Sequence, residues 1–592
     1  MPPRDPRNIT EGSLIPVQRY ADQPYVVRTD DGAWLCTVTT GPGREGEPGQ
    51  HVRSMRSTDL GRTWSEPLPL EDPAGPESAY STLLKTPGGR IFCFYNYNAR
   101  NIREVVAPEA HFKGGICRRV DTMGDFVLRY TDDGGRTWSA KRYAIPVREF
   151  DCDRTNHYGG KVRFFWHVGR GFIHEGGVYC THIKLPDMSF AQSEGTLLHS
   201  PDLLKVSDPG EATWHTWPEG TIGLRAPAGG GTVSEEQSVV PLSDGSFFCV
   251  YRTEDRHPAC AYSRDRGRTW SAARYVEFAD GRQIRHPRAA CFVWRCANGK
   301  FLLWTHNNGA PVWTGRNPAW LCGGVEADGP EGRVIRWSQP EIVLYDDDPM
   351  VRISYPDLIE DGGRYFITET QKSLARAHEV DPALIEGLWR QFEPAGEAAA
   401  GELLALSAPE GVTGEADMPK LPAFCVRDNS QPQMSTGHQR QGFSIEFVVT
   451  FDSLEAGQGI LDARDSAGRG VRIQTAADGA VEIVLNDGLT ESRWSSDAGL
   501  LKPGRRHHVV ATVDGGPHII SFVVDGALCD GGTQRPYGWG WFNAYLTHVN
   551  WAQRARLARG LRGRLSLVRV YGRALRTSEA IGNYRQVGVR ET

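Results

Sequence analysis

Short apolar segments separated by turn residues recur through the first two thirds of the chain. In six places a glycine is followed directly by a short apolar or aromatic run, at Gly32, Gly89, Gly177, Gly245, Gly299 and Gly363. The steps between these glycines are 57, 88, 68, 54 and 64 residues. Each glycine is typical of a turn that leads into the second strand of a small antiparallel sheet. The pattern therefore predicts six similar sheets of about 65 residues each.

A second repeat has the form S/T-x-D-x-G-x-T-W and marks the turns more specifically. It occurs at residues 57–64, 131–138 and 263–270, and residues 207–214 look like a degenerate copy. Its aspartate can accept hydrogen bonds from backbone amides, its glycine allows a positive φ, and its tryptophan can pack beneath the neighbouring sheet. We therefore assign these aspartates to the scaffold and not to the chemistry.

These motifs resemble the Asp-box (BNR) repeats of the sialidase superfamily. The resemblance implies an all-β chain whose residues 1–394 form a six-bladed β-propeller, with residues 13–19 closing the last blade. In such a ring the first strands of the blades converge at the axis, where a site is expected.

The pattern changes after residue 375. One short helix is expected at residues 381–389, with Asp381 as its cap. Residues 395–432 are rich in Ala, Gly, Glu and Pro and are interpreted as a linker. Strand-like alternation then returns at residues 443–451, 507–513, 519–526 and 563–575. This succession resembles a laminin-G or concanavalin-like β-sandwich, which we place at residues 433–592.

Charge and cysteine content exclude several classes of protein. The chain has 67 basic and 72 acidic side chains and a net charge of −5, so we expect no nucleic-acid partner. The 12 cysteines form no CxxC pair and several lie inside apolar runs, which favours buried free thiols over disulfides or a metal site.

The sequence predicts no membrane span, because no run of about 18 apolar residues occurs. Residues 1–7 lack the apolar core of a secretory signal. We expect a cytoplasmic protein if the chain begins here, and a secreted or periplasmic one if a leader was removed.

The candidate site residues lie at a shared distance before the repeat glycines. The distance to the next repeat glycine is 9 residues for Gln23 and Glu236, 11 for Arg288 and 8 for Tyr355. Because these residues lie at similar distances before the turns of different blades, we expect their side chains to meet in one site at the mouth of the ring.

The sialidase resemblance implies roles for two of these residues. In that family a glutamate at the start of one blade activates a tyrosine at the start of the last, and the tyrosine acts as nucleophile. Glu236 and Tyr355 match these positions. A neutral phenol suits this chemistry, because an anionic attacker would be repelled by the carboxylate on the substrate's anomeric carbon. The alternatives are a surface strand position for Glu236 and a core aromatic position for Tyr355.

The resemblance also implies an arginine clamp for the substrate carboxylate. Arg252 and Arg316 match the second and third arginines of the family, and Glu369 resembles the acid that supports the clamp. Guanidinium groups read carboxylates in a bidentate fashion. Either arginine could instead be an exposed loop charge.

Two positions depart from the family. Asp22-Gln23-Pro24 stands where the first arginine is expected, so Asp22 and Gln23 are counted as substrate-binding and Arg288 or Arg53 would fill the missing charge. His51 stands in the region of the family's acid/base aspartate, and an imidazole can transfer protons near neutral pH. His51 could equally be an incidental strand residue.

The leading hypothesis is an exo-acting glycoside hydrolase that removes a terminal acidic sugar, sialic acid first, from a glycan. Its chemistry requires no cofactor and no metal. The first alternative is a lyase that cleaves rhamnosyl-glucuronate caps by β-elimination, which would suit His51, Arg288 and the missing arginine. The second alternative is a non-catalytic glycan-binding propeller. The partner is a glycan or sialoglycoconjugate in each case, and the sequence does not indicate an oligomeric state.

Overall fold

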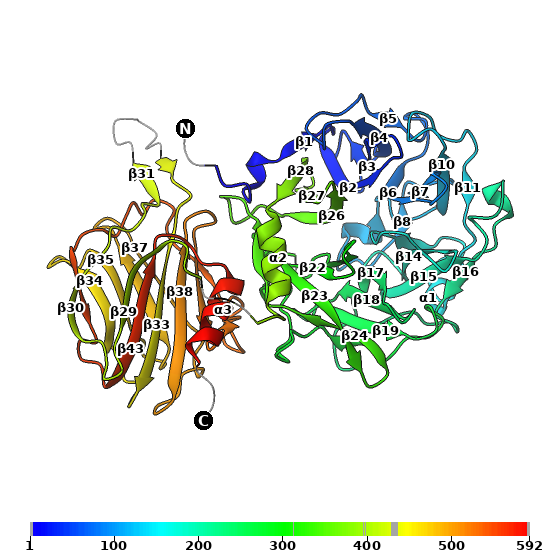
Figure 1. Cartoon of the computed structure of the whole chain (residues 1–592). Helices are drawn as coiled ribbons and strands as arrows, with labels where there is room; N and C mark the ends of the chain where they lie inside the picture. Colours follow the sequence, from blue (N-terminus) through cyan, green and yellow to red (C-terminus); the bar gives the residue numbers. More distant parts are fainter. Residues whose placement is uncertain (1–3, 312, 395, 397, 428–435, 589–592) are drawn as a thin grey trace.

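The computed structural model describes residues 4–311, 313–394, 396, 398–427 and 436–588. Six antiparallel sheets follow one another along the first part of the chain and stand in a ring (Figure 1). The first three blades are β2 (Tyr20–Arg28), β3 (Trp34–Gly41), β4 (His51–Ser57) and β5 (Leu68–Pro69); β6 (Ser78–Lys85), β7 (Ile91–Tyr97), β10 (Asp125–Thr131) and β11 (Tyr143–Ala144); and β12 (Phe164–Trp166), β13 (Phe172–His174), β14 (Gly177–Leu185), β15 (Glu194–Ser200) and β16 (His215–Trp217).

The last three blades complete the ring. They are β17 (Glu235–Pro241), β18 (Phe247–Arg252), β19 (Ala259–Ser263) and β20 (Arg274–Tyr275); β21 (Phe292–Arg295), β22 (Phe301–Thr305), β23 (Ala319–Gly329), β24 (Gly332–Trp337) and β25 (Glu341–Leu344); and β26 (Ser354–Asp361), β27 (Arg364–Thr370), β28 (Ala375–Val380) and β1 (Ser13–Ile15). Because β1 from the N-terminus pairs with β28, the ring closes by antiparallel pairing, as the sequence predicts. The architecture is the six-bladed β-propeller expected from the repeats.

The Asp-box turns follow the third strands of their blades. In the first, the Asp59 carboxylate accepts hydrogen bonds from the Thr63 amide at 2.9 Å and the Thr63 hydroxyl at 2.7 Å. The boxes after β10 and β19 repeat these contacts through Asp133 and Asp265. These aspartates therefore hold turns together, as expected.

A fourth box follows β15, but the assignment to residues 207–214 is wrong in its first half. Ser200 and Asp202 begin the turn, and the Thr213 amide donates to the Asp202 carboxylate at 2.8 Å. The spacing misled the interpretation because an insertion containing η3 (Pro209–Glu211) separates the two halves of the box. Asp208 instead caps η3 through the Gly210 amide.

Two further sheets form a β-sandwich beside the propeller (Figure 1). One contains β29 (Glu402–Ser407), β43 (Gly563–Tyr571), β33 (Phe443–Phe451), β38 (Arg506–Asp514), β39 (Ile519–Val524), β40 (Ala527–Leu528) and β41 (Gly540–Trp541); the other contains β30 (Gly414–Asp417), β42 (Arg554–Leu557), β34 (Gly459–Arg464), β35 (Gly470–Thr475), β36 (Val481–Asn486) and β37 (Glu491–Ser495). Apolar side chains of both sheets share one buried core. The expected linker, residues 395–432, thus contributes β29 and β30 to the sandwich sheets instead of lying wholly between two units.

The remaining elements are short. They are β8 (Val105–Val106), β9 (Ile116–Cys117), β31 (Cys425–Arg427), β32 (Thr436–His438), η1 (Ile9–Glu11), η2 (Lys113–Gly115), α1 (Asp151–Arg154), α2 (Pro382–Arg390) and α3 (Thr577–Val587). The Asp381 carboxylate accepts from the Ala383 amide and caps α2, as predicted. None of the described helices has the length and apolar character that crossing a membrane requires. All 12 cysteines are buried and free of disulfides.

The sandwich packs against the propeller through a mixed apolar and ionic interface. Trp320 of β23 and Trp539 share a buried cluster, with ring centroids 6.0 Å apart. The Trp539 indole also donates to the Asn307 carbonyl at 2.9 Å. Arg7 joins the N-terminal segment to β38 through Asp514 at 2.7 Å. These contacts join β23, the segment after β22 and the N-terminal segment to the sandwich.

Candidate active site

The first strands of four blades share a backbone irregularity near the axis of the ring, a residue with a positive φ. Gln23 in β2, Tyr80 in β6, Glu236 in β17 and Tyr355 in β26 have φ values of 52°, 56°, 60° and 49°. Each lies where the pairing with the second strand shifts register. Such bulges re-aim a side chain, and a non-glycine residue at positive φ costs of order 1–3 kcal/mol. In these four strands, the position at a shared distance before the turn glycine is the site of a β-bulge. The bulge changes the direction of one side chain in each strand.

Two of these residues are in direct contact. The Tyr355 hydroxyl donates to Glu236 Oε1 at 2.9 Å, although 119 positions separate them in sequence. Both side chains are buried, with residue exposures of 7% and 1%. Burial and the negative charge of Glu236 raise the pKa of Tyr355 to about 12. Burial also raises the pKa of Glu236, against the opposing effect of Arg252.

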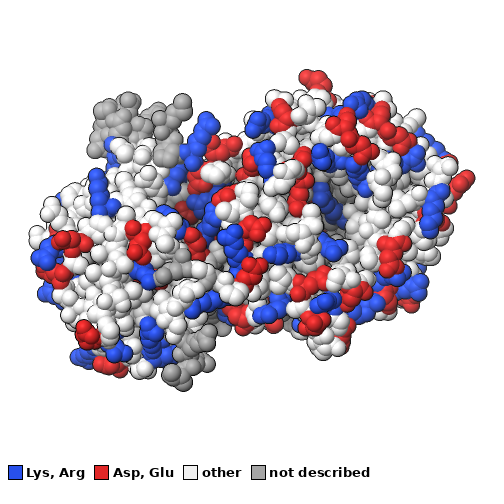
Figure 2. Space-filling view, viewed as in Figure 1, with Lys and Arg blue, Asp and Glu red and all other residues white. Residues whose placement is uncertain are grey.

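The pair lies in a cavity of about 260 Å³ at the mouth of the ring. The described side chains that line it are Glu45, Tyr80, Arg119, Thr122, Trp166, Phe190, Glu236, Arg252, Arg288, Trp313, Arg316, Arg352, Tyr355 and Lys372. Six of these are Lys or Arg and two are Glu, so the cavity is basic in a chain of net charge −5. Figure 2 shows a hollow on the propeller with Lys and Arg side chains inside it. Such a cavity suits an anionic ligand.

A buried glutamate next to the pair organises two of the arginines. Glu235 contacts Arg252 Nη2 at 2.7 Å and Arg288 Nη2 at 2.9 Å. Arg252 Nη1 also lies 2.9 Å from Glu236 Oε2. These contacts fix the orientation of Arg252 and Arg288 before any ligand binds.

Arg316 approaches the same space from the segment before β23. Its Nη1 donates to the Ser354 hydroxyl at 3.0 Å and its Nη2 to the Arg288 carbonyl at 2.9 Å. Its Nε is buried and has no hydrogen-bond partner among the described residues. A buried guanidinium with unused donor capacity is suited to binding an anion.

A lysine stands on the other side of the tyrosine. Lys372 Nζ lies 2.6 Å from Asp22, 3.4 Å from Glu45 and 4.2 Å from the centre of the Tyr355 ring. Burial acts to raise the pKa of Glu45, but Lys372 and Arg119 outweigh it and hold that pKa well below its usual range. Glu45 is therefore ionised at neutral pH.

Comparison with known proteins agrees with the sheets and turns. Residues 428–580 match the concanavalin A-like lectin/glucanases superfamily, and residues 129–140 match the BNR/Asp-box repeat. A sialidase of Clostridium perfringens is 25% identical over 304 residues, which covers 49% of this chain and 68% of that protein. The chain is a divergent sialidase-like protein with a C-terminal laminin-G-like domain.

Two solved structures with which the chain can be aligned also carry sialidase names. Trypanosoma rangeli sialidase in complex with 2,3-difluorosialic acid is 13% identical, with 98% of this chain and 97% of that chain covered and a TM-score of 0.43. The intramolecular trans-sialidase of Ruminococcus gnavus is 13% identical, with 64% and 98% covered and a TM-score of 0.44.

The sialidase-like chain brings together five of the residues selected from its sequence. Glu236, Tyr355, Arg252, Arg288 and Arg316 all line the mouth cavity. Arg288 therefore adds a charge to the mouth. Asp22 is buried behind the cavity and reaches it only through Lys372.

Four other selected residues are not among the cavity-lining side chains. His51 is 3% exposed and begins β4, which is the third strand of its blade and lies away from the axis. Arg53 lies on the same strand. Gln23 has the expected bulge, but its amide turns to the His167 carbonyl at 3.0 Å. Glu369 supports no clamp arginine, because its carboxylate is held by His378 and Gln371.

The sequence analysis missed several residues of the cavity. Tyr80 could have been found, since it lies nine positions before Gly89 and so obeys the spacing rule used for the others. Glu45, Arg119 and Lys372 had no such signal, because they come from connections between strands. Trp313 is 55% exposed at the rim, three positions before Arg316.

Proposed function

We propose that this protein is a sialidase-fold glycosidase that removes a terminal acidic sugar, sialic acid first, from a glycan. The observation that carries the proposal is the 2.9 Å contact between the Tyr355 hydroxyl and Glu236 inside a basic cavity. A buried phenol hydrogen-bonded to a buried carboxylate is the arrangement that nucleophilic catalysis by tyrosine needs.

In the proposed first step Tyr355 Oη bonds to the anomeric carbon while the glycosidic C–O bond breaks, and the departing oxygen takes a proton from water. The phenolic proton passes to Glu236, which must be ionised to accept it. Arg252, 2.9 Å from the carboxylate, favours that ionised form against the effect of burial. Because the phenol is neutral until it reacts, it is not repelled by a carboxylate on the same carbon. In the second step water attacks the anomeric carbon while its bond to Tyr355 Oη breaks. Glu236 returns its proton to Tyr355, and the proton of the attacking water passes to solvent.

The substrate carboxylate fits between the guanidinium groups of Arg252, Arg288 and Arg316. Glu235 prearranges the first two, and Arg316 has a buried Nε without a partner among the described residues. Prearranged charged donors bind an anion without reorganisation during the reaction. Lys372 keeps a further positive charge beside Tyr355 in a chain that lacks the family's first arginine.

Glu45 replaces His51 as our candidate for positioning water beside the reacting carbon. It is the carboxylate besides Glu236 among the described residues that line the cavity. Because Lys372 and Arg119 keep it ionised, Glu45 is suited to accept a hydrogen bond from the water of the second step and to orient that water. Of the features that suited the lyase alternative, His51 lies outside the cavity lining, whereas Arg288 lines the cavity and Gln23 still stands in place of the first arginine.

A covalent trap tests the proposal directly. The protein is incubated with 2,3-difluorosialic acid and its intact mass is measured; we expect one adduct, located on Tyr355 by peptide mass spectrometry and absent from Tyr355→Phe. Tyr355→Phe and Glu236→Gln should each lower turnover of a sialoside by at least about 10². Leu489→Ala, at a position 77% exposed on the sandwich, is the control and should leave turnover unchanged.

Two results would contradict the assignment. One is turnover at the wild-type rate in both Tyr355→Phe and Glu236→Gln, and the other is an adduct on a different residue. Adding a neutral sugar acceptor and analysing the products separates hydrolysis from transfer, since only a transferase forms a new glycoside.

A further inference from the structure

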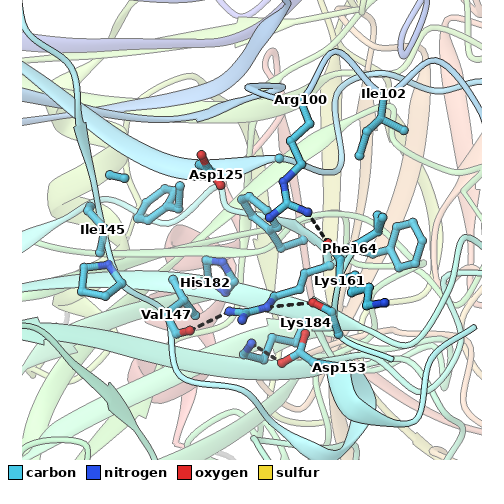
Figure 3. Close-up of a pocket in the computed structure, with 18 residues that line it drawn as sticks. Arg100, Ile102, Asp125, Ile145, Val147, Asp153, Lys161, Phe164, His182 and Lys184 are labelled. Carbon is cyan, nitrogen blue, oxygen red and sulfur yellow. Dashed lines mark hydrogen bonds and ion pairs between the residues drawn. The ribbon is translucent and has the colours of Figure 1, made fainter. Parts of the chain in front are cut away.

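A second cavity lies between the second and third blades (Figure 3). Its volume is about 330 Å³, larger than the roughly 260 Å³ of the mouth cavity. Its lining comes from β10, β12 and β14 and from the segments at 144–147 and 160–163. It is therefore large enough for a ligand of the size proposed for the mouth.

The floor of this cavity carries a buried ion pair that the proposed mechanism does not use. Lys184 Nζ contacts Asp153 Oδ2, and the side chain of each residue is 1% exposed. The Phe150 amide donates to the same Oδ2 at 2.8 Å. Asp153 Oδ1 is buried and has no hydrogen-bond partner among the described residues. The floor thus offers an ammonium donor beside an unused carboxylate acceptor.

The arginines at the cavity are already engaged by the protein. Arg100 donates to the Lys161 carbonyl (Figure 3). Arg163 donates to the Val147 carbonyl at 2.8 Å and to Glu149 at 2.7 Å. Arg163 is therefore paired with a carboxylate, whereas Arg100 keeps its charge on an exposed side chain and Asp125 and Lys161 also line the cavity. Lys184 and Asp153 are balanced in charge and remain the polar pair on the floor.

The rest of the wall is mostly apolar. The apolar side chains are Ile102, Phe126, Ile145, Pro146, Val147, Val162, Phe164 and Phe165. A concave site with apolar walls and a few convergent polar groups is the usual form of a small-molecule site. An adjacent donor and acceptor match neighbouring hydroxyl groups, each of which can both accept and donate. The chemistry therefore suits a neutral polyhydroxylated ring.

This cavity and the mouth share a wall. Trp166, at the end of β12, lines the mouth cavity, whereas Phe164 and Phe165 of the same strand line the second cavity. Thr122 and Gly124 are divided between the two cavities in the same way. A glycan whose terminal sugar occupies the mouth would have its next units close to this wall.

We propose that the cavity above Lys184 and Asp153 is a non-catalytic site for a neutral sugar unit of the glycan. The choice of a glycan as ligand rests on the proposed function, whereas the binding itself needs no cleavage. One hydroxyl accepts from the Lys184 ammonium, a neighbouring hydroxyl donates to Asp153 Oδ1, and the C–H face of the ring lies on the apolar wall.

Binding is tested on Tyr355→Phe, so that turnover does not interfere. Galactose, glucose and N-acetylglucosamine are titrated separately and followed by saturation-transfer NMR of the sugar. We expect saturable binding of at least one of these sugars. That binding should be lost when Val147→Trp is combined with Tyr355→Phe, because the indole is designed to fill the cavity away from the ion pair. Val426→Trp makes the same change at a position 58% exposed on the sandwich and should bind normally.

A second variant tests the polar floor. Replacing both partners, as Asp153→Asn with Lys184→Met, avoids leaving a lone buried charge that would unfold the protein. We expect at least a tenfold weaker affinity in the folded double variant. Binding that survives both this change and Val147→Trp would overturn the inference, as would no detectable binding of any of the three sugars. A protein that binds the sugar but cleaves no sialoside would contradict the proposed function and leave this site standing.

Discussion

The two ends of the propeller use carboxylates in opposite ways. At the Asp-box end, hydrogen bonds from the Thr63 hydroxyl and amide hold the pKa of Asp59 at about 2. At the mouth, burial raises the pKa of Glu236, and its contacts come from residues far away in sequence. The first carboxylate is fully committed to a turn as an anion. The second keeps the capacity to exchange a proton, which is the property that general base catalysis requires.

The same difference separates local from long-range construction. Asp59 and Thr63 are four positions apart, whereas Tyr355 is 119 positions from Glu236 and Lys372 is 350 from Asp22. A turn can be assembled before the ring closes, but the mouth exists only after all six blades are in place. Changes at the mouth should therefore affect chemistry, and changes at the turns should affect stability.

The largest contrast between the mouth and the Asp-box turns is expected when an arginine is replaced by lysine in each place. Arg316→Lys removes a planar guanidinium from the mouth and should lower kcat/KM for a sialoside by about 10². Arg268→Lys, in an exposed Asp-box turn, should leave kcat/KM within about twofold. Steady-state kinetics on both variants checks the contrast, and equal losses would contradict it.

An intermediate effect is expected from pH. Glu236 must be ionised to accept the Tyr355 proton, and burial raises its pKa, so kcat/KM should fall about tenfold per pH unit on acidification below that raised pKa. The pKa of Tyr355, about 12, predicts no loss from that group between neutrality and about pH 9. A pH profile of kcat/KM measures both limbs. The acidic limb should disappear from the residual activity of Glu236→Gln, and its persistence there would assign it to another group.

The smallest effect on activity should come from an Asp-box aspartate. Asp59→Ala removes three turn hydrogen bonds and should lower the free energy of unfolding by about 1 kcal/mol, with kcat/KM unchanged. Because the folded pKa of Asp59 is depressed, its contribution is present above about pH 4 and is lost as pH falls towards about 2. Denaturant unfolding at both pH values checks this, with Glu66→Ala on the same turn as control. A loss of activity without loss of stability would break the distinction between the two ends.

Much of the fold and part of the site follow from sequence patterns. Turn glycines and Asp boxes predicted six blades, and the distance to the next glycine selected Glu236 and Tyr355 correctly as mouth residues. The same rule would also have found Tyr80. It works because each first strand has nearly the same length between its bulge and its turn.

The errors share one physical cause, which is that distance along the chain does not report distance from the axis. His51 precedes an Asp box at a plausible spacing but belongs to a third strand, while Gln23 has the right depth and turns to a backbone carbonyl. Glu45 and Lys372 carry no periodic signal, because connections between strands vary in length and course.

Repeats, turns, capping and the exclusion of a membrane span follow from residues that are close together, since backbone conformation depends on neighbours within a few positions. The composition of the mouth and of the cavity above Lys184 follows from ring closure. Only the assembled blades bring Tyr355 and Arg252 within 3 Å of Glu236 and remove water from around its carboxylate. This removal of water raises the pKa of Glu236 above that of an ordinary carboxyl group.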